Sequence, residues 1–252
     1  GGGADVGREV RTVVPGPGAV PMLILAIETA TEQVGVAIGG HEGVIANFEV
    51  VRGRRHAEIL TPAIEFVCRQ ADVDLAEIGC LAVDVGPGLF TGMRVGLASA
   101  KALALALRVP MIGISSLDLL AFECRHTDRV VVPVIDARKN EVFWAMYRQV
   151  PGGVQQVSPP VVGPVDLLVA DLLARSQDTL CVGDGAERHR TAILEGYRCE
   201  IAAPVHPSPA ALVQLAHARA LREDWVRPDE IEPVYLRAPD AQINWSTRAG
   251  RP

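Results

Sequence analysis

A run of glycines is the first candidate for chemistry in this sequence. The run Gly86-Pro-Gly-Leu-Phe-Thr-Gly-Met-Arg-Val-Gly96 follows an apolar segment typical of a strand and opens a segment typical of a helix. Glycines let backbone N–H groups approach an anion, and the N-terminus of a helix favours negative charge. Gly86, Gly88 and Thr91 are therefore candidate phosphate-binding residues. The same spacing also fits a tight turn that packs a helix of small residues close to a sheet.

Common signatures of catalysis and metal binding are absent from the sequence. The glycine run is neither a dinucleotide G-x-G-x-x-G nor a Walker loop, because no G-K-[ST] follows it. The six histidines have no H-E-x-x-H or H-x-x-x-H spacing, so we expect no dedicated metal site. The five cysteines are odd in number and contain no C-x-x-C, which favours reduced thiols in a cytosolic protein over a disulfide framework.

Composition limits the classes of protein to which the chain can belong. Its 252 residues, 49% of them hydrophobic, can form one large α/β domain or two small lobes. The formal net charge of −6 argues against a chain that grips a nucleic-acid backbone by itself. Arg52, Arg54 and Arg55 form the only tight basic run, and a solvated helix start explains it better. The longest apolar run, 95–107, is too short to span a bilayer, which needs about 20 residues.

The elements that must position the glycine run follow from hydrophobic periodicity. The first half of the chain predicts the order βββαβαβα, which implies a mixed sheet covered by helices. Pro62 marks either a kink in the first helix or its true start near Thr61. The expected strands are 22–27, 34–38, 43–50, 80–85 and 111–114, and the expected helices are 54–71, 91–107 and 117–124.

A second cycle of similar elements begins at Val130. Acidic residues follow the first strand of each cycle, Glu28 after Ile27 and Asp136 after Ile135. We interpret this as an internal duplication of one lobe, reduced in its second copy. The second cycle predicts a strand at 142–146, a helix at 210–221 capped by Ser208, and a last strand at 232–237. The expected organisation is a tail at 1–21, with Met22 as the natural start, a first lobe at 22–126, a second lobe at 127–237 and a tail at 238–252.

The helix expected at 91–107 is unusual because it is apolar nearly all round. After Arg94 its only charged residue is Lys101. A helix on the surface should have one polar face, so this helix should be covered on two sides. Either another helix of the same chain or a partner subunit could supply the second cover.

Several strings of residues together resemble the TsaB (YeaZ) family. They are Ile27-Glu-Thr-Ala-Thr31, the glycine run, Ile135-Asp-Ala-Arg138 with Glu141-Val142, and Tyr235-Leu-Arg237. The resemblance covers about 22–245. It implies two duplicated ribonuclease-H-like lobes of the actin-like ATPase (ASKHA) superfamily. It also implies a non-catalytic subunit that binds and activates TsaD, together with TsaE, in threonylcarbamoyladenosine modification of tRNA.

The resemblance further implies how the partners meet. We expect a heterodimer with TsaD, a homodimer when the chain is alone, contact with tRNA only through the complex, no membrane, and a cytoplasmic location. The helices at 54–71 and 91–107 should build the dimer surface. The residues expected at this surface are Arg55, His56, Leu60, Ile64, Val67, Arg94, Leu97, Lys101 and Leu103.

The same resemblance argues against autonomous catalysis. The catalytic relative holds a metal through an H-x-x-x-H pair, and the matching stretch here, 114–118, has no histidine. The first phosphate loop of the superfamily carries Asp and then Gly, whereas this chain has Glu28 and Ala30, which would crowd a phosphate and its Mg²⁺. We expect no cofactor of its own, with ATP or ADP at the complex interface as an open alternative. The candidate nucleotide-binding residues are Glu28, Thr29, Thr31, Gly86, Gly88, Thr91, Asp136 and Lys139.

Two other functions stay open at this point. The superfamily also contains ATPases and small-molecule kinases, which the two-lobe fold favours and the altered first loop opposes. Relatives have also been labelled glycoproteases. A peptidase needs a nucleophile with its base, or a water activated by a metal. Ser115 and Ser116 have no partner of this kind that the sequence can assign, and there is no G-x-S-x-G.

Overall fold

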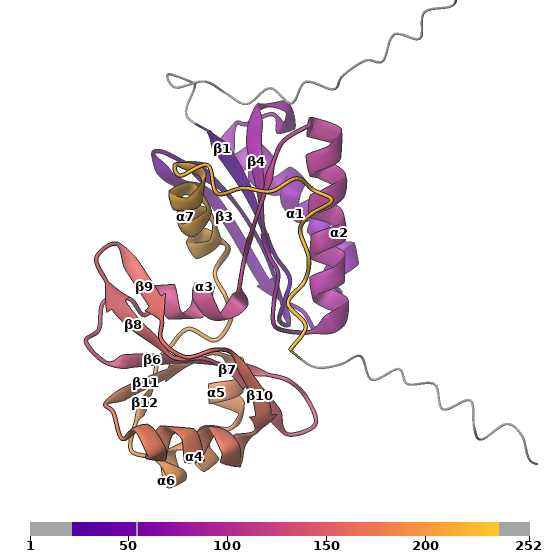
Figure 1. The fold of residues 1–252 in the computed structure, drawn as a ribbon. Helices are drawn as coiled ribbons and strands as arrows, with labels where there is room; N and C mark the ends of the chain where they lie inside the picture. Colours follow the sequence, from indigo (N-terminus) through magenta and orange to yellow (C-terminus); the bar gives the residue numbers. More distant parts are fainter. Residues whose placement is uncertain (1–21, 54, 237–252) are drawn as a thin grey trace, which may run out of the picture.

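The computed structural model describes residues 22–53 and 55–236, which form two lobes, each built on its own sheet (Figure 1). The first sheet has the strand order β3-β2-β1-β4-β5. Strand β1 pairs antiparallel with β2, to which a short turn connects it, and parallel with β4, which the chain reaches by a crossover through a helix. Its strands are β1 (Leu23–Glu28), β2 (Gln33–Gly40), β3 (Gly43–Val51), β4 (Ile78–Asp84) and β5 (Met111–Ile114).

The second sheet repeats this topology. Five of its seven strands, in the order β10-β7-β6-β11-β12, match the order of the first sheet, and β6 again pairs antiparallel with β7 and parallel with β11. The expected duplication and the fold class are therefore confirmed. Most strands are shorter than their counterparts, so the second copy is the reduced one. They are β6 (Val130–Asp136), β7 (Glu141–Trp144), β10 (Val161–Pro164), β11 (Thr179–Val182) and β12 (Glu200–Ile201).

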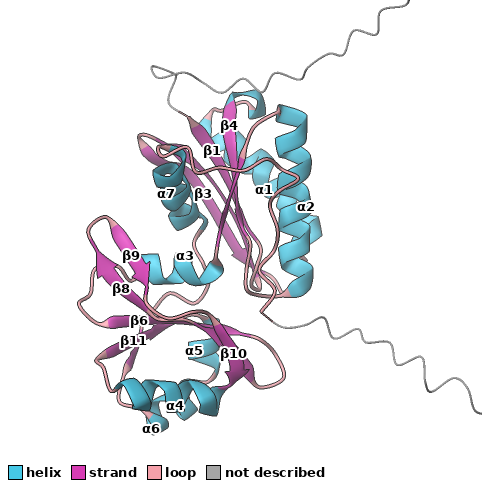
Figure 2. Cartoon of the chain, viewed as in Figure 1, coloured by secondary structure: helices cyan, strands magenta, loops and turns pink. Residues whose placement is uncertain are grey.

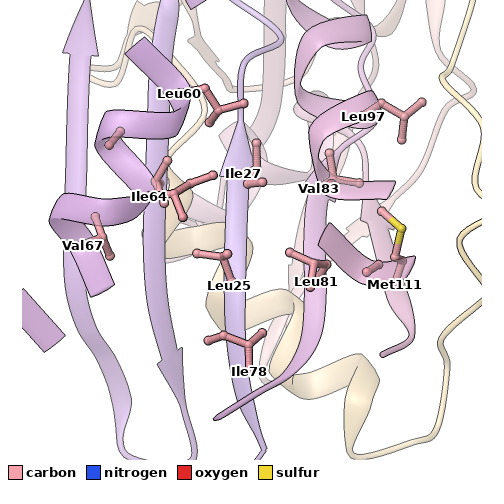
Figure 3. Close-up of a cluster of buried hydrophobic side chains, with 14 of the residues drawn as sticks. Leu25, Ile27, Leu60, Ile64, Val67, Ile78, Leu81, Val83, Leu97 and Met111 are labelled. Carbon is pink, nitrogen blue, oxygen red and sulfur yellow. The ribbon is translucent and has the colours of Figure 1, made fainter. Parts of the chain in front are cut away.

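One face of the first sheet is covered by helices α1 (His56–Ala71) and α2 (Phe90–Leu107). Side chains of both helices meet those of β1 and β4, and the close-up in Figure 3 shows Leu60, Ile64 and Val67 from α1 and Leu97 from α2 above this sheet. The first residue of α1 is His56, so the alternative start near Thr61 is wrong, and Pro62 lies inside the helix.

The last helix of each repeat packs against the other lobe. Helix α3 (Ser116–Glu123) ends the first repeat, yet its Leu117 and Leu120 pack with residues of β6 and β11 (Figure 2). Helix α7 (Pro209–Ala220) ends the second repeat, yet its Leu212 and Val213 pack with β1 and β4. The segment expected as a second lobe, 127–237, therefore contains a helix that covers the first sheet, and the exchange ties the lobes together.

Other parts of the second repeat differ from expectation. The strand expected at 142–146 is present as β7 but ends at Trp144. A hairpin of β8 (Tyr147–Val150) and β9 (Gly153–Gln156) begins beyond the expected range. The strand expected at 232–237 is wrong over its described part, 232–236, where a single bond from Val234 N–H to the Val85 carbonyl joins it to the first lobe. Three helices were missed: α4 (Val165–Arg175), α5 (Asp184–Arg188) and α6 (Arg190–Gly196).

The expected cap of α7 is present, since Ser208 Oγ accepts the N–H of Ala210 at 3.2 Å and Pro209 is the first helical residue. The expected tails, 1–21 and 238–252, lie outside the described residues, as do Arg54 and Arg237. Within the described chain, α2 is long and apolar enough to cross a membrane by length and composition alone. Its Leu97, Ala100 and Ala104 are buried on the first sheet, as in a core helix.

Candidate functional site

The turn after β1 is organised by a buried glutamate. Glu28 is fully buried, with Oε1 accepting the N–H of Ala30 at 2.7 Å and Oε2 accepting Gln33 Nε2 at 3.1 Å. Burial, and then repulsion from Asp84, raise the pKa of Glu28 well above its ordinary value. Both carboxyl oxygens of Glu28 are therefore already used by hydrogen bonds within the turn.

Asp84 lies beside Glu28, because the adjacent parallel strands β1 and β4 pair Ile27 with Val83 and both acids follow directly. Its Oδ1 accepts the Gly86 N–H at 2.7 Å and the Ser116 hydroxyl at 2.6 Å, whereas its Oδ2 is buried without a hydrogen-bond partner. Burial raises the pKa of Asp84 to about 7. Burial thus raises the pKa of both neighbouring acids, and the charge of Asp84 raises that of Glu28 further.

The glycine run packs closely against the turn after β1. Gly86 has a φ of +91°, which only glycine adopts readily, and a Cβ on Gly88 would overlap the Ala30 carbonyl. The Ala30 carbonyl also accepts the Leu89 N–H at 2.7 Å, and Thr29 Oγ1 donates to the Gly92 carbonyl at 2.8 Å. Of the two explanations for the run, this geometry favours close packing of a helix start over an open phosphate cradle.

The remaining members of the predicted nucleotide set lie in different places. Thr31 is buried, and its Oγ1 accepts the Gln33 N–H at 3.4 Å. Thr91 is exposed in the first turn of α2. Asp136 and Lys139 belong to the second lobe, at the turn after β6, where Asp136 is buried and Lys139 is exposed with a φ of +52°.

An ion pair joins the two turns that face each other from the two lobes. Arg138 donates from Nη2 to Glu32 Oε1 at 2.8 Å, and its Nη1 lies 3.3 Å from Asp136 Oδ2. Arg188 lies 3.4 Å from the same Asp136 oxygen, and Asp184 Oδ1 accepts the Asp136 N–H at 3.0 Å. The acidic side chain that could have met a cation at this turn is therefore already paired with arginines.

The serines considered for a peptidase have structural partners. Ser115 Oγ caps α3 by accepting the Leu117 N–H at 3.1 Å, and the fully buried Ser116 donates to Asp84. A nucleophile must reach its substrate and have a base to take its proton. Neither hydroxyl meets both conditions.

Several residues expected at a partner surface are buried within the chain itself. Leu60, Ile64, Val67 and Leu97 all belong to the core between the first sheet and its helices, and at most 7% of each is exposed. His56 is also buried, with Nε2 2.7 Å from the Thr31 carbonyl oxygen. The prediction that these five form the contact surface is wrong, because the apolar side of each helix faces its own sheet.

Other members of that set do face outward. Arg55 and Arg94 are exposed, Arg55 in an ion pair with Glu58, while Lys101 and Leu103 are half-buried. The exposed stripe of α2 runs through Thr91, Arg94, Ala98, Ala102 and Leu105, and 65% of the Leu105 side chain is accessible. After Arg94 this stripe carries no charged residue, so one face of an apolar helix has no cover within the described chain.

Metal ligands do not gather anywhere in the described residues, where no group of three or more His, Cys, Asp or Glu side chains is arranged to hold an ion. Sequence reasoning missed Asp84, Glu32 and Arg138 as parts of the site. Asp84 had a usable signal, since an acid at the end of a second buried strand mirrors Glu28. The Arg138–Glu32 pair had none, because it depends on how the lobes face each other.

The sequence and the fold have known relatives. Residues 44–245 match the family model described as TsaD, tRNA N6-adenosine threonylcarbamoyltransferase. An uncharacterized protein of Mycobacterium leprae is 37% identical over 87% of this chain, which spans 56% of that relative's length. The tRNA threonylcarbamoyladenosine biosynthesis protein TsaB of Escherichia coli is 31% identical over 91% of this chain and all of its own length, and that of Bacillus subtilis is 29% identical over 89% and 98%.

Solved structures lead to the same group. YeaZ of Pseudomonas aeruginosa superimposes with a TM-score of 0.73 at 26% identity, covering 85% of this chain and all of that one. Another Pseudomonas aeruginosa structure, described as similar to peptidase YeaZ, has a TM-score of 0.76 at 28% identity over 86% of this chain. With matches in sequence and in fold over most of its length, the chain belongs to the TsaB (YeaZ) family, within the broader TsaD family of sequences.

Proposed function

We propose that this chain is an accessory subunit in the biosynthesis of threonylcarbamoyladenosine in tRNA. In this role it binds a TsaD-type transferase and TsaE, and it contributes a surface, not a catalytic group. Contact with tRNA runs through the complex, in keeping with the net charge of −6. The named relatives from Escherichia coli and Bacillus subtilis support the pathway.

The observation that carries the proposal is the uncovered stripe of α2. Three successive turns present Ala98, Ala102 and Leu105 to solvent, while the opposite face is buried in the first core. Figure 1 places α2 along the outer side of the first lobe, away from the second lobe, so that a partner can reach it. Small residues allow the backbone of another helix to approach closely, and the 65% exposed Leu105 offers it an apolar side chain.

The turns between the lobes support a role without nucleotide turnover. Glu28 uses both oxygens within its own turn, and Arg138 bridges to Glu32 across the lobes. A nucleotide with its Mg²⁺ would have to displace these contacts. ATP or ADP at the interface of the assembled complex stays a separate proposal, which binding measurements on the complex would address.

The experiment that tests the proposal measures association by sedimentation velocity. The chain alone should form a homodimer, and an equimolar mixture with a TsaD-type transferase should form a mixed dimer. Leu105→Glu should weaken both by at least about a hundredfold, because a charge would be buried at the centre of the contact. Leu105 suits this test better than the half-buried Leu103, since a change at an exposed position leaves the monomer stability within about 0.5 kcal/mol.

Leu173→Glu supplies the matched control. Leu173 lies on α4 of the second lobe and is 55% exposed, so the same substitution removes a similar apolar side chain elsewhere. Undiminished association in Leu105→Glu, or equal loss in both variants, would contradict the proposed surface. Rapid ATP turnover by the chain alone, lost in Glu28→Ala, would instead favour an enzyme of the actin-like superfamily.

A further inference from the structure

Two thiols lie side by side at the far edge of the second sheet. Cys181 Sγ, in β11, is 4.0 Å from the Sγ of Cys199, which directly precedes β12. Leu180 pairs with Glu200 in the parallel strands β11 and β12. Cys181 follows Leu180 and Cys199 precedes Glu200, so both cysteine side chains lie on the same face of the sheet. Cys181 is fully buried and Cys199 is half-buried.

The outer member of this pair borders a surface cavity. Cys199 lines a cavity of about 450 Å³ together with Arg129, Tyr197, Arg198 and Glu200. The cavity is wide enough for small polar molecules to meet the Cys199 sulfur, whereas Cys181 lies behind it in the core of the lobe. The outer thiol is thus accessible, and the inner thiol is sheltered but in contact with it.

We propose that Cys199 and Cys181 form a peroxide-reactive dithiol, with Cys199 as the attacking thiol and Cys181 as the resolving thiol. This modification site is distinct from the turns between the lobes and from the exposed stripe of α2.

The ionisation of the cysteines agrees with these roles. A hydrogen bond from Cys181 lowers the pKa of Cys199, and the thiolate is the reactive form of cysteine. Burial raises the pKa of the other half-buried cysteines, Cys68 and Cys124, the latter to about 11. Reaction with a peroxide should therefore select Cys199.

The chemistry proceeds in two balanced steps. The Cys199 thiolate attacks one peroxide oxygen, so an S–O bond forms, the O–O bond breaks, and hydroxide leaves and becomes water by taking up the proton that Cys199 released to solvent when it ionised. Cys199 is oxidised to a sulfenic acid while hydrogen peroxide is reduced. Cys181 then loses its proton and attacks the Cys199 sulfur, which forms the S–S bond and releases the hydroxyl as water. In total, two thiols and one hydrogen peroxide give one disulfide and two waters.

Closure of the disulfide needs movement that this edge of the sheet can provide. The sulfurs must approach from 4.0 Å to about 2.05 Å. Strand β12 has only two residues and is the last strand of its sheet. Its contacts include the parallel pairing with β11, the bond from Ala202 N–H to the Cys181 carbonyl and the ion pair of Arg129 with Glu200. A strand of two residues at the edge of a sheet can adjust locally while β6 and β11 keep their pairing.

The test treats the reduced full-length chain with hydrogen peroxide and maps the products by mass spectrometry. Cleavage after Lys and Arg places Cys181 in peptide 176–188 and Cys199 in peptide 199–219, each without another cysteine. The expected product is these two peptides joined by a disulfide. In Cys181→Ser, dimedone should instead trap a sulfenic acid on 199–219, because the resolving thiol is absent.

A rate measurement separates the donor role of Cys181 from its resolving role. At neutral pH, iodoacetamide should alkylate Cys199 at least about tenfold faster than Cys124, in line with its larger thiolate fraction. Cys181→Ala should slow this alkylation severalfold, whereas Cys181→Ser, which keeps an O–H donor, should not. Circular dichroism checks that each variant is folded.

Two results would overturn the proposal. One is equal oxidation of Cys68, Cys124 and Cys199 in the folded chain. The other is a sulfenic acid on Cys199 that persists in the unmodified chain without any link between peptides 176–188 and 199–219.

Discussion

The two lobes have the same order of five strands, but the acids at the ends of these strands have different partners. In the first lobe, Glu28 and Asp84 are sealed in the interior and held by backbone and neutral side-chain donors. In the second lobe, Asp136 is paired with Arg138 and Arg188. The same topology thus yields a buried, proton-retaining pair on one side and a charge-balanced turn on the other. In both lobes, Glu28, Asp84 and Asp136 make hydrogen bonds or ion pairs within the chain.

The helices after the fourth strands differ as well. The first lobe has one continuous helix of 18 residues, α2, with an apolar outer stripe, whereas the second lobe has two short helices, α5 and α6. A duplicated lobe can therefore lose its long helix without losing its sheet. This difference favours the first lobe as the docking lobe, which is the basis of the proposed function.

The largest expected effect comes from the exchanged helices. Leu212→Ala, at a fully buried position on α7, should lower the free energy of unfolding by about 2–5 kcal/mol. Because Leu212 packs on the first sheet, hydrogen exchange should speed up in β1 and β2. Leu120→Ala on α3 is the matched change and should expose β6 and β11 instead. The reverse pattern of exchange would contradict the exchange of helices between lobes.

The next effect concerns pH. The folded Asp84 keeps its proton up to about pH 7, whereas the unfolded one loses it near 3.8. The folded state therefore binds more protons in this window, and stability should fall as pH rises through it. Asp84→Asn should make this loss of unfolding free energy smaller by roughly a few kcal/mol, since one pKa unit corresponds to about 1.4 kcal/mol.

Asp184→Asn makes the corresponding change after the fourth strand of the second lobe. Burial raises the pKa of Asp184 only to about 6. Asp184→Asn should therefore remove a smaller part of the pH dependence of stability than Asp84→Asn, over a window whose upper end lies about one pH unit lower. Denaturant unfolding from pH 4 to pH 8 measures both variants. An Asp84→Asn profile with the slope of the parent chain would show that the buried pair does not retain a proton.

The smallest expected effect is that of the ion pair between the lobes. Arg138 and Glu32 are about half-exposed, so Arg138→Ala should cost less than about 1 kcal/mol in stability. A thermal melt of Arg138→Ala measures this cost, with Arg55→Ala, which removes the pair with Glu58 inside one lobe, as the control. A loss above about 2 kcal/mol, absent in the control, would mean that the pair itself holds the lobes together.

Much of the fold could be predicted because its signals are local. The apolar strand at 22–27, the glycine turn and the Ser208 cap depend on neighbours in sequence, and the similar order of both halves indicated the duplication. The packing of α7 on the first sheet could not be predicted. Both faces of that sheet are apolar, and no local feature of the sequence indicates which helix covers which face. The short helices α5 and α6 have too few turns for a clear period.

The candidate site was less predictable for the same reason. Glu28 and Asp84 are 56 positions apart, and only the pairing of β1 with β4 makes them neighbours. For α2, the sequence correctly identified a helix without a polar face but could not tell its inner stripe from its outer one. The sequence does not distinguish Leu97 from Leu105, yet Leu97 is 7% exposed and Leu105 is 65% exposed in the fold.

The proposed function requires that this chain contribute a docking surface to threonylcarbamoyl transfer. The most direct measurement is formation of threonylcarbamoyladenosine by a TsaD-type transferase, with TsaE, on tRNA at increasing concentrations of this chain. We expect transfer to depend on the unmodified chain and to be kept by Leu173→Glu. Leu105→Glu should abolish transfer or shift it to at least about a hundredfold higher concentration of the chain. Transfer that proceeds equally without the chain, or with Leu105→Glu at the parent concentration, would contradict it.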